Sequence, residues 1–145
     1  MKESVKSSHP RSTFCFCVSG QRLGDDLLSR METLLTTLAE SRTWVIGPPT
    51  LADEHDGDVR IIGGALDLYA AIPPFGADLP KEVDRQHLEE VTSVVDAVAQ
   101  LSQETGLEVS FTLDQNYVGR IKNGEPDDLI QIGLLREWKK AHGIS

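Results

Sequence analysis

Aromatic and basic side chains are scarce in this sequence, and long apolar runs are absent. Aromatic residues make up 6%, and 14 Lys and Arg stand against 23 Asp and Glu, a formal net charge of -9. The shortage of bases argues against direct nucleic-acid binding, because a protein that neutralises phosphates must display clustered Lys and Arg. No window approaches the roughly 18 uninterrupted apolar residues of a membrane span, so no membrane partner is expected. Any charged partner should be basic.

Cysteine is also scarce. Cys15 and Cys17 are the only two, and they lie two apart in a segment that reads as a strand, at a separation awkward for an unstrained disulfide. We expect reduced, buried thiols and neither a metal nor a cofactor, because a structural zinc site needs four ligands. Reduced thiols imply a cytoplasmic location. Residues 1–12 lack the apolar core of a signal peptide and read as a short disordered lead to a single domain, residues 13–145.

Hydrophobic periodicity predicts an α+β domain. The predicted strands are residues 13–18, 43–46, 59–72, 109–113 and 117–121, and the predicted helices are residues 24–41, residues 80–105 and a last helix from Pro126. Gly63 and Gly64 predict a bulge or bend in the third strand. The order is that of a ferredoxin-like split β-α-β-β-α-β unit, with both long helices on one face of an antiparallel sheet and a further strand and helix at the end.

The densest polar cluster falls in the predicted loop between the second and third strands and comprises Asp53, Glu54, His55, Asp56 and Asp58. A calcium loop of the EF-hand kind is excluded, because the twelfth position from Asp53 is Gly64 and not Glu. A metal site, a solvated turn and an acidic docking surface remain. Residues 50–114 hold fourteen acids and three bases, and a field of that sign favours encounter with a cationic protein.

No catalytic constellation is visible. The four histidines lie at positions 9, 55, 87 and 142 without a sequence partner, so we predict that the protein is not an enzyme and that His87 is structural. Arg22 follows a strand and precedes a helix, where the acylphosphatases carry a phosphate-binding arginine. The glycine-and-aromatic run of that family is not reproduced around it; an enzyme with Arg22 as an anion binder is the third hypothesis.

Exposed aromatic residues are frequent interface anchors. We assign Trp44 and Trp138 to the core and expect Phe75, in a Pro-Pro-Phe-Gly loop, and Tyr117, beside a turn, to lie on a contact surface. The acidic residues of the second long helix form either a solvated face or an extension of the acidic docking surface; they are Glu82, Asp84, Glu89 and Glu90.

The closing run, residues 117–126 and then Leu134 to Trp138, resembles the ends of small bacterial accessory proteins, some of which resemble immunity proteins of interbacterial toxin systems. The resemblance implies a cytoplasmic inhibitor of a basic cognate toxin, such as a nuclease. On this hypothesis the inhibitor binds through Asp53, Glu54, Asp56 and Asp58, with Phe75 or Tyr117 as an apolar anchor. The alternative is a small-molecule-binding regulatory module of ferredoxin-like fold that forms a homodimer through its sheet.

Overall fold

Three helices and six strands make up the part of the chain that the structure describes. The computed structural model describes residues 11–20, 23–69 and 81–136. In chain order the elements are β1 (Arg11–Gly20), α2 (Asp25–Ser41), β2 (Thr50–Asp56), β3 (Val59–Tyr69), α3 (Lys81–Thr105), β4 (Val109–Leu113), β5 (Asn116–Lys122), β6 (Glu125–Pro126) and the π-helical segment η1 (Leu129–Arg136). None of these helices is long and apolar enough to cross a membrane.

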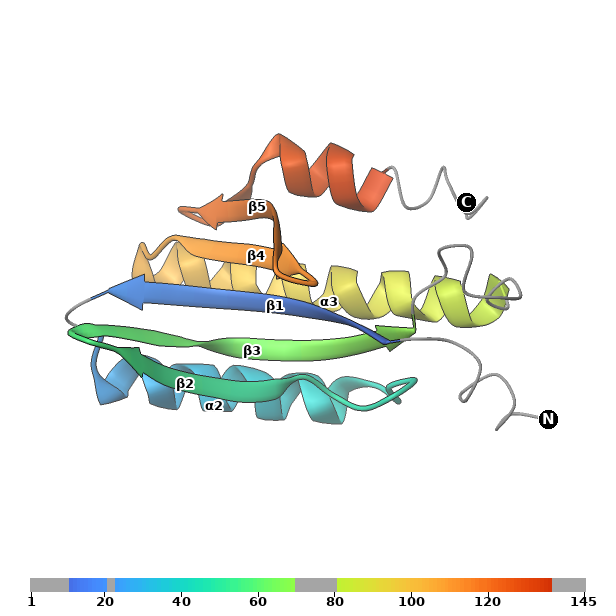
Figure 1. Ribbon diagram of the computed structural model, residues 1–145. Coiled ribbons are helices and arrows are strands. Elements are labelled where there is room, and N and C mark those ends of the chain that lie inside the picture. Colours follow the sequence, from blue (N-terminus) through green and yellow to red (C-terminus); the bar gives the residue numbers. More distant parts are fainter. Residues whose placement is uncertain (1–10, 21–22, 70–80, 137–145) are drawn as a thin grey trace.

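The strands form one antiparallel sheet in the order β2-β3-β1-β4-β5-β6. β1 and β2 are both antiparallel to β3 and therefore run in the same direction. The helix α2 connects β1 to β2 and crosses over β3. In Figure 1, α2 and α3 lie along the same face of the sheet, and η1 packs against β5 and β6 at its far edge. The prediction of an α+β domain with an antiparallel sheet is confirmed.

The core lies between the sheet and the two long helices. Alternation along β1 directs Phe14, Phe16 and Val18 into it, each at most 3% exposed, and the Phe14 ring stacks on Phe111 of β4 with 5.4 Å between centroids. The helices contribute residues at helical spacing: Leu27, Met31, Leu35 and Leu38 from α2, and Leu88, Val91, Val94, Val95, Val98 and Leu101 from α3. Burial of each such side chain contributes about 1.5–3 kcal/mol.

The predicted second strand is wrong. Residues 43–46 form no strand; instead the Trp44 side chain is buried, as predicted, and its Nε1 donates to the Leu38 carbonyl oxygen at the end of α2, 3.1 Å away. The second strand is β2, in the segment that was predicted to be an acidic loop. Charged residues are tolerated there because β2 is an edge strand of the sheet that the described residues form, and edge strands in native sheets commonly carry charge.

The Gly63-Gly64 pair does not interrupt the third strand. β3 is continuous, and at Gly63 the backbone of β1 comes so close that a Cβ atom would collide with the Phe16 carbonyl oxygen. At Gly64 a Cβ atom would meet the Phe16 ring, 2.7 Å from its Cζ. The glycines therefore permit close approach and make room for an aromatic ring.

Because β3 is long, β1 begins at Arg11, pairing with Tyr69, two residues earlier than predicted.

The end of the described chain also differs from the prediction. Pro126 lies in the short strand β6 rather than in the first turn of a helix, and η1 begins at Leu129. Asp127 joins the two parts: its Oδ1 accepts from the Ile130 N–H at 3.2 Å, and its Oδ2 accepts from the Arg120 N–H at 3.2 Å. A side-chain oxygen that accepts backbone N–H groups satisfies donors that a helix start leaves free.

Candidate functional site

The acidic residues predicted to bind a partner lie on a β-hairpin at one edge of the sheet. Asp53, Glu54 and Asp56 belong to β2, and Asp58 lies in the two-residue turn into β3. Gly57, the other turn residue, has φ of 62°, a left-handed conformation in which glycine avoids the steric cost of a side chain. Asp53, Glu54 and Asp58 are exposed.

Arg60 engages one of these carboxylates. Its Nε and Nη2 donate to the two Asp53 carboxylate oxygens at 2.9 and 2.8 Å, and its Nη1 donates to the Leu23 carbonyl and to Asp25 Oδ1, each at 3.3 Å. The hydrogen bonds from Arg60 hold the pKa of Asp53 below its usual value, and those to Asp53 raise the pKa of Arg60. This contact ties the hairpin to the start of α2 and neutralises Asp53.

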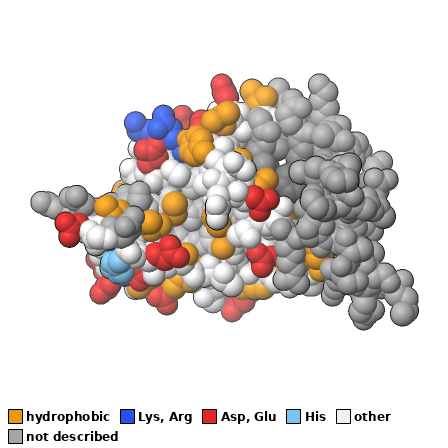
Figure 2. All heavy atoms as spheres, viewed as in Figure 1, with side chains coloured by type: hydrophobic (Ala, Val, Ile, Leu, Met, Phe, Trp, Pro, Cys, Tyr) orange, Lys and Arg blue, Asp and Glu red, His pale blue; other side chains and the backbone are white. Residues whose placement is uncertain are grey.

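The acidic cluster is therefore divided between two faces of the sheet. Asp53 pairs in register with Ile62, whose side chain enters the core, so Asp53 lies on the helix-covered face. Its neighbour Glu54 alternates to the opposite face, which carries no helix among the described residues. Figure 2 views this open face, where acidic side chains stand around patches of small and apolar ones.

Tyr117 is 53% exposed, as predicted for a contact residue, but it lies far from the hairpin. Across the open face it is in register with Thr112, then with Cys15, Ala65 and finally Thr50 of β2. Four strand spacings separate it from β2, about 19 Å. The structure does not bring the acids and Tyr117 together, and Phe75, Trp138 and Arg22 lie outside the described residues.

The two cysteines lie on the open face, not in the core. Both are free and half-buried, and burial raises the pKa of each thiol; for Cys15 a hydrogen bond with Thr112 opposes that rise, and Asp67 adds to it. A reactive thiol needs an electropositive setting that lowers its pKa. The surroundings of these thiols have the opposite effect, so their chemistry is not that of an activated nucleophile.

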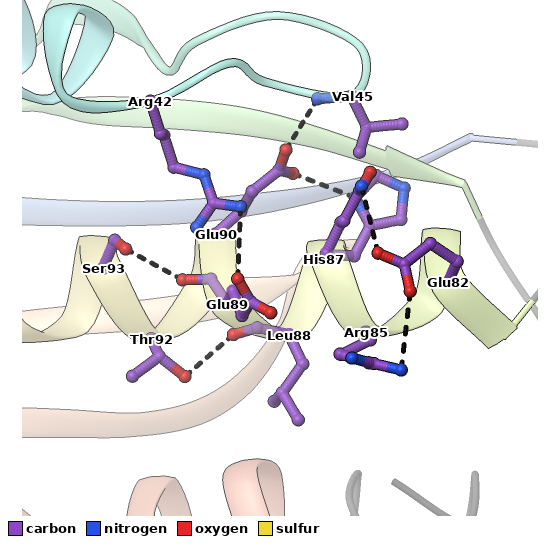
Figure 3. Close-up of polar contacts among 11 residues, drawn as sticks. Arg42, Val45, Glu82, Arg85, His87, Leu88, Glu89, Glu90, Thr92 and Ser93 are labelled. Carbon is purple, nitrogen blue, oxygen red and sulfur yellow. Dashed lines mark hydrogen bonds and ion pairs between the residues drawn. The ribbon is translucent and has the colours of Figure 1, made fainter.

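A buried polar pair on α3 is the feature that the sequence reading missed. His87 and Glu90 are both fully buried. Glu90 Oε1 lies 3.0 Å from His87 Nδ1, and Glu90 Oε2 accepts from the Val45 N–H at 2.7 Å (Figure 3). The Tyr69 N–H donates to His87 Nε2 at 3.1 Å. Since that nitrogen accepts, the ring proton is on Nδ1 and is donated to Glu90.

The His87–Glu90 pair holds two backbone segments in place. It joins α3 to the end of β3 and to the segment that follows α2, and each of its side-chain nitrogen and oxygen atoms has a hydrogen-bond partner. Because both side chains are closed to solvent, they have no access to a substrate. The burial of His87 agrees with the prediction that it is structural. The prediction that Glu90 lies on a solvated face is wrong, because its side chain is buried. Glu82 and Glu89 are exposed as predicted. Spacing held a signal, because Glu90 precedes buried Val94 by one helical turn.

A groove of about 470 Å³ separates α2 from α3 on the outer side of the helical layer. Its floor is apolar, its α2 wall carries hydroxyl groups, and one end holds an exposed Arg30–Glu104 ion pair of 3.4 Å. The lining residues are Ser29, Arg30, Thr33, Leu34, Thr37, Leu38, Ser41, Ala97, Gln100, Leu101 and Glu104. Its volume falls in the range of ligand pockets, about 300–1,000 Å³.

In the described ranges, no three side chains of His, Cys, Asp or Glu are grouped so that they could hold a metal ion. No protein-family model, curated protein or solved structure matches this chain. The features of the described residues that bear on function are therefore the hairpin, the open face, the buried pair and the groove.

Proposed function

We propose that this chain is a non-enzymatic, cytoplasmic binding protein that neutralises a basic cognate toxin domain, as immunity proteins do. The observation that carries the proposal is the β2–β3 hairpin. It sits at an edge of the sheet, exposes Glu54 and Asp58, and holds a single base, Arg60, which is already engaged by Asp53. A surface of this kind attracts a cationic protein and fixes its orientation.

Two further observations support the proposal. The buried His87–Glu90 pair is closed to solvent and has its hydrogen bonds satisfied, so it offers no acid or base to a substrate. One face of the antiparallel sheet carries no helix among the described residues (Figure 1), and β2 lies at an edge of that sheet; a partner can add to surfaces of this kind.

The test is affinity capture with the full chain from a lysate of its source organism, washed at low and then moderate salt. We expect a basic protein at stoichiometric level that is toxic when expressed alone and harmless when co-expressed with this chain. The double variant Glu54→Lys, Asp58→Lys should slow association and reduce its salt dependence. The matched control Glu32→Lys, Asp96→Lys places the same charges on exposed positions of α2 and α3. Equal effects of the two double variants would remove the hairpin from the proposal.

The groove between the helices favours a second candidate, a small-molecule-binding regulatory module. It predicts a rise in melting temperature with some metabolite, which Thr37→Trp, in the lining of the groove, would abolish, together with a homodimer in sedimentation. A monomer that shows no thermal shift with a metabolite library, beside a captured basic partner, would exclude this candidate.

A further inference from the structure

The sheet ends in two unlike edges. At one edge β6 is only two residues long, and η1 packs against it and against β5. At the other edge β2 extends over seven residues, and among the described strands it pairs only with β3. Since alternate residues of an antiparallel edge strand direct their N–H and C=O groups away from the sheet, β2 offers a row of hydrogen-bonding groups to an added strand. It is the long free edge of the described sheet.

The side chains of β2 differ between its two faces. On the open face Glu54 is exposed, and among the described residues it has no ion-pair partner within 4.0 Å. On the helix-covered face lie Leu51, whose side chain is 42% exposed, and Asp53, already bound by Arg60. An added strand would thus meet an acid on one face and an exposed leucine on the other.

We infer that the β2 edge binds an extended basic segment of the partner protein by strand addition. The inferred segment alternates with period two: Lys or Arg on the face toward Glu54, and apolar residues on the face toward Leu51. Backbone hydrogen bonds supply affinity in this mode, and alternate side chains supply specificity. The inference rests on the proposed function for the biological source of the segment, and it adds the mode of binding and the sequence pattern.

The complementarity follows from charge and from the backbone together. A like-charged strand would be repelled by the edge, and a purely apolar strand would leave Glu54 facing a neighbour that cannot pair with it. A basic, alternating strand satisfies both faces. Leu51 also gains burial against it, which a surface contact by charge alone would not require.

The experiment uses the full chain and a seven-residue peptide of alternating Lys and Val with blocked ends. A peptide of the same composition with Lys and Val in separate blocks is the first control, and the alternating peptide N-methylated at every amide, which leaves neither edge able to donate, is the second. Amide hydrogen exchange is followed by NMR at each residue of β2. We expect the alternating peptide to slow exchange about tenfold or more at every second residue of β2, and to bind at least tenfold more tightly than either control.

Variants test the side chains. Glu54→Lys should weaken peptide binding about three- to tenfold, whereas Glu32→Lys on α2 should leave it unchanged. Leu51→Thr, which keeps β propensity, should weaken binding by a similar factor. Equal binding of the N-methylated peptide, or protection at residues outside β2, would overturn strand addition.

Failure of this inference and failure of the proposed function give different results. If the captured basic protein binds with no change in exchange along β2, the inference fails and the inhibitor proposal stands. If the alternating peptide protects β2 but no toxic basic protein is neutralised by the chain, the edge binds as inferred and the proposed function is wrong.

Discussion

His87 and Glu90 lie one turn apart on α3, and inside the core His87 Nδ1 donates a hydrogen bond to Glu90 Oε1, 3.0 Å away. The pair has a consequence for stability. Replacing Glu90 by Ala removes the acceptor of the buried His87 Nδ1–H and that of the partly buried Val45 N–H. Each unsatisfied donor costs about 1–3 kcal/mol, so Glu90→Ala should lower the free energy of unfolding by about 2–5 kcal/mol.

Urea unfolding measures this loss. Glu90→Gln keeps one acceptor oxygen and should lose about half as much as Glu90→Ala. The adjacent Glu89 is exposed, so Glu89→Ala should change stability by no more than about 0.5 kcal/mol. Similar losses for the Ala variants at positions 89 and 90 would contradict the burial of Glu90.

The tautomer of His87 is a second expected outcome. Because the Tyr69 N–H donates to Nε2, that nitrogen should be bare and Nδ1 should carry the proton. Long-range ¹H–¹⁵N correlation spectra distinguish the two ring nitrogens by chemical shift. Observation of a protonated Nε2 in the native protein would rule out the hydrogen bond from Tyr69.

The described elements divide into those that local sequence determines and those that tertiary pairing determines. β1 could be predicted because Phe14 and Phe16 alternate with polar residues, and α3 because its valines recur at helical spacing. β2 could not, because acidic residues have low β propensity and β2 forms by pairing with β3, its one partner among the described strands. Arg60, which engages Asp53, comes from the far side of the turn.

The candidate site was predicted only in part. The exposure of Tyr117 was predicted from its place beside a turn. Its separation from the acidic residues depends on the order of strands in the sheet, which hydrophobic periodicity cannot predict. Glu90 was missed because glutamate on a helix usually faces water, and because one of its two donors, the Val45 N–H, comes from a segment distant in sequence. The sign of the charge follows from composition, and its location follows from the positions of the acidic residues in the sequence. The division of these residues between two faces of the sheet depends on strand pairing and could not be predicted.

The glycine pair in β3 yields a third prediction. Gly63→Ala places a Cβ against the Phe16 carbonyl oxygen and Cys17 Cα, which are backbone atoms that have little room to move. Gly64→Ala instead places one against the Phe16 ring and Leu35, which can shift. We expect a loss of about 3 kcal/mol or more for the first and about 1–3 kcal/mol for the second.

The two glycine variants separate further in combination with Phe16→Leu. The smaller side chain should recover part of the loss in Gly64→Ala and none of it in Gly63→Ala, a coupling that a double-mutant cycle measures. Gly47→Ala is the control, because a Cβ there meets no atom within 4 Å. Equal coupling of Phe16→Leu to both variants would show that the ring does not occupy the space over Gly64.

The thiols of Cys15 and Cys17 should react slowly. Burial raises the pKa of both, so at pH 7.5 each holds less thiolate than a cysteine in a free peptide, and alkylation by iodoacetamide should be correspondingly slower. Mass spectrometry counts the modified sites over time, with the protein in urea as the control in which both react at peptide rates. Alkylation of the native protein as fast as in urea would contradict the environment described for the open face.

The Asp53–Arg60 contact should make stability depend on pH in acid. The pKa of Asp53 is lowered in the folded protein from the usual 3.8, chiefly by hydrogen bonds from Arg60, so its ionised form is favoured by folding. That contribution is present above the unfolded-state pKa and is lost as pH falls through the folded-state pKa. Asp53→Asn should therefore be less stable than the wild type at pH 7 and lose less stability on acidification from about pH 5 to pH 2. Glu54→Gln, beside it but on the opposite face, should keep the wild-type stability at pH 7. Urea unfolding at intervals of one pH unit resolves the two curves, and superimposable curves for Asp53→Asn and the wild type would mean that Arg60 does not hold the hairpin through this carboxylate.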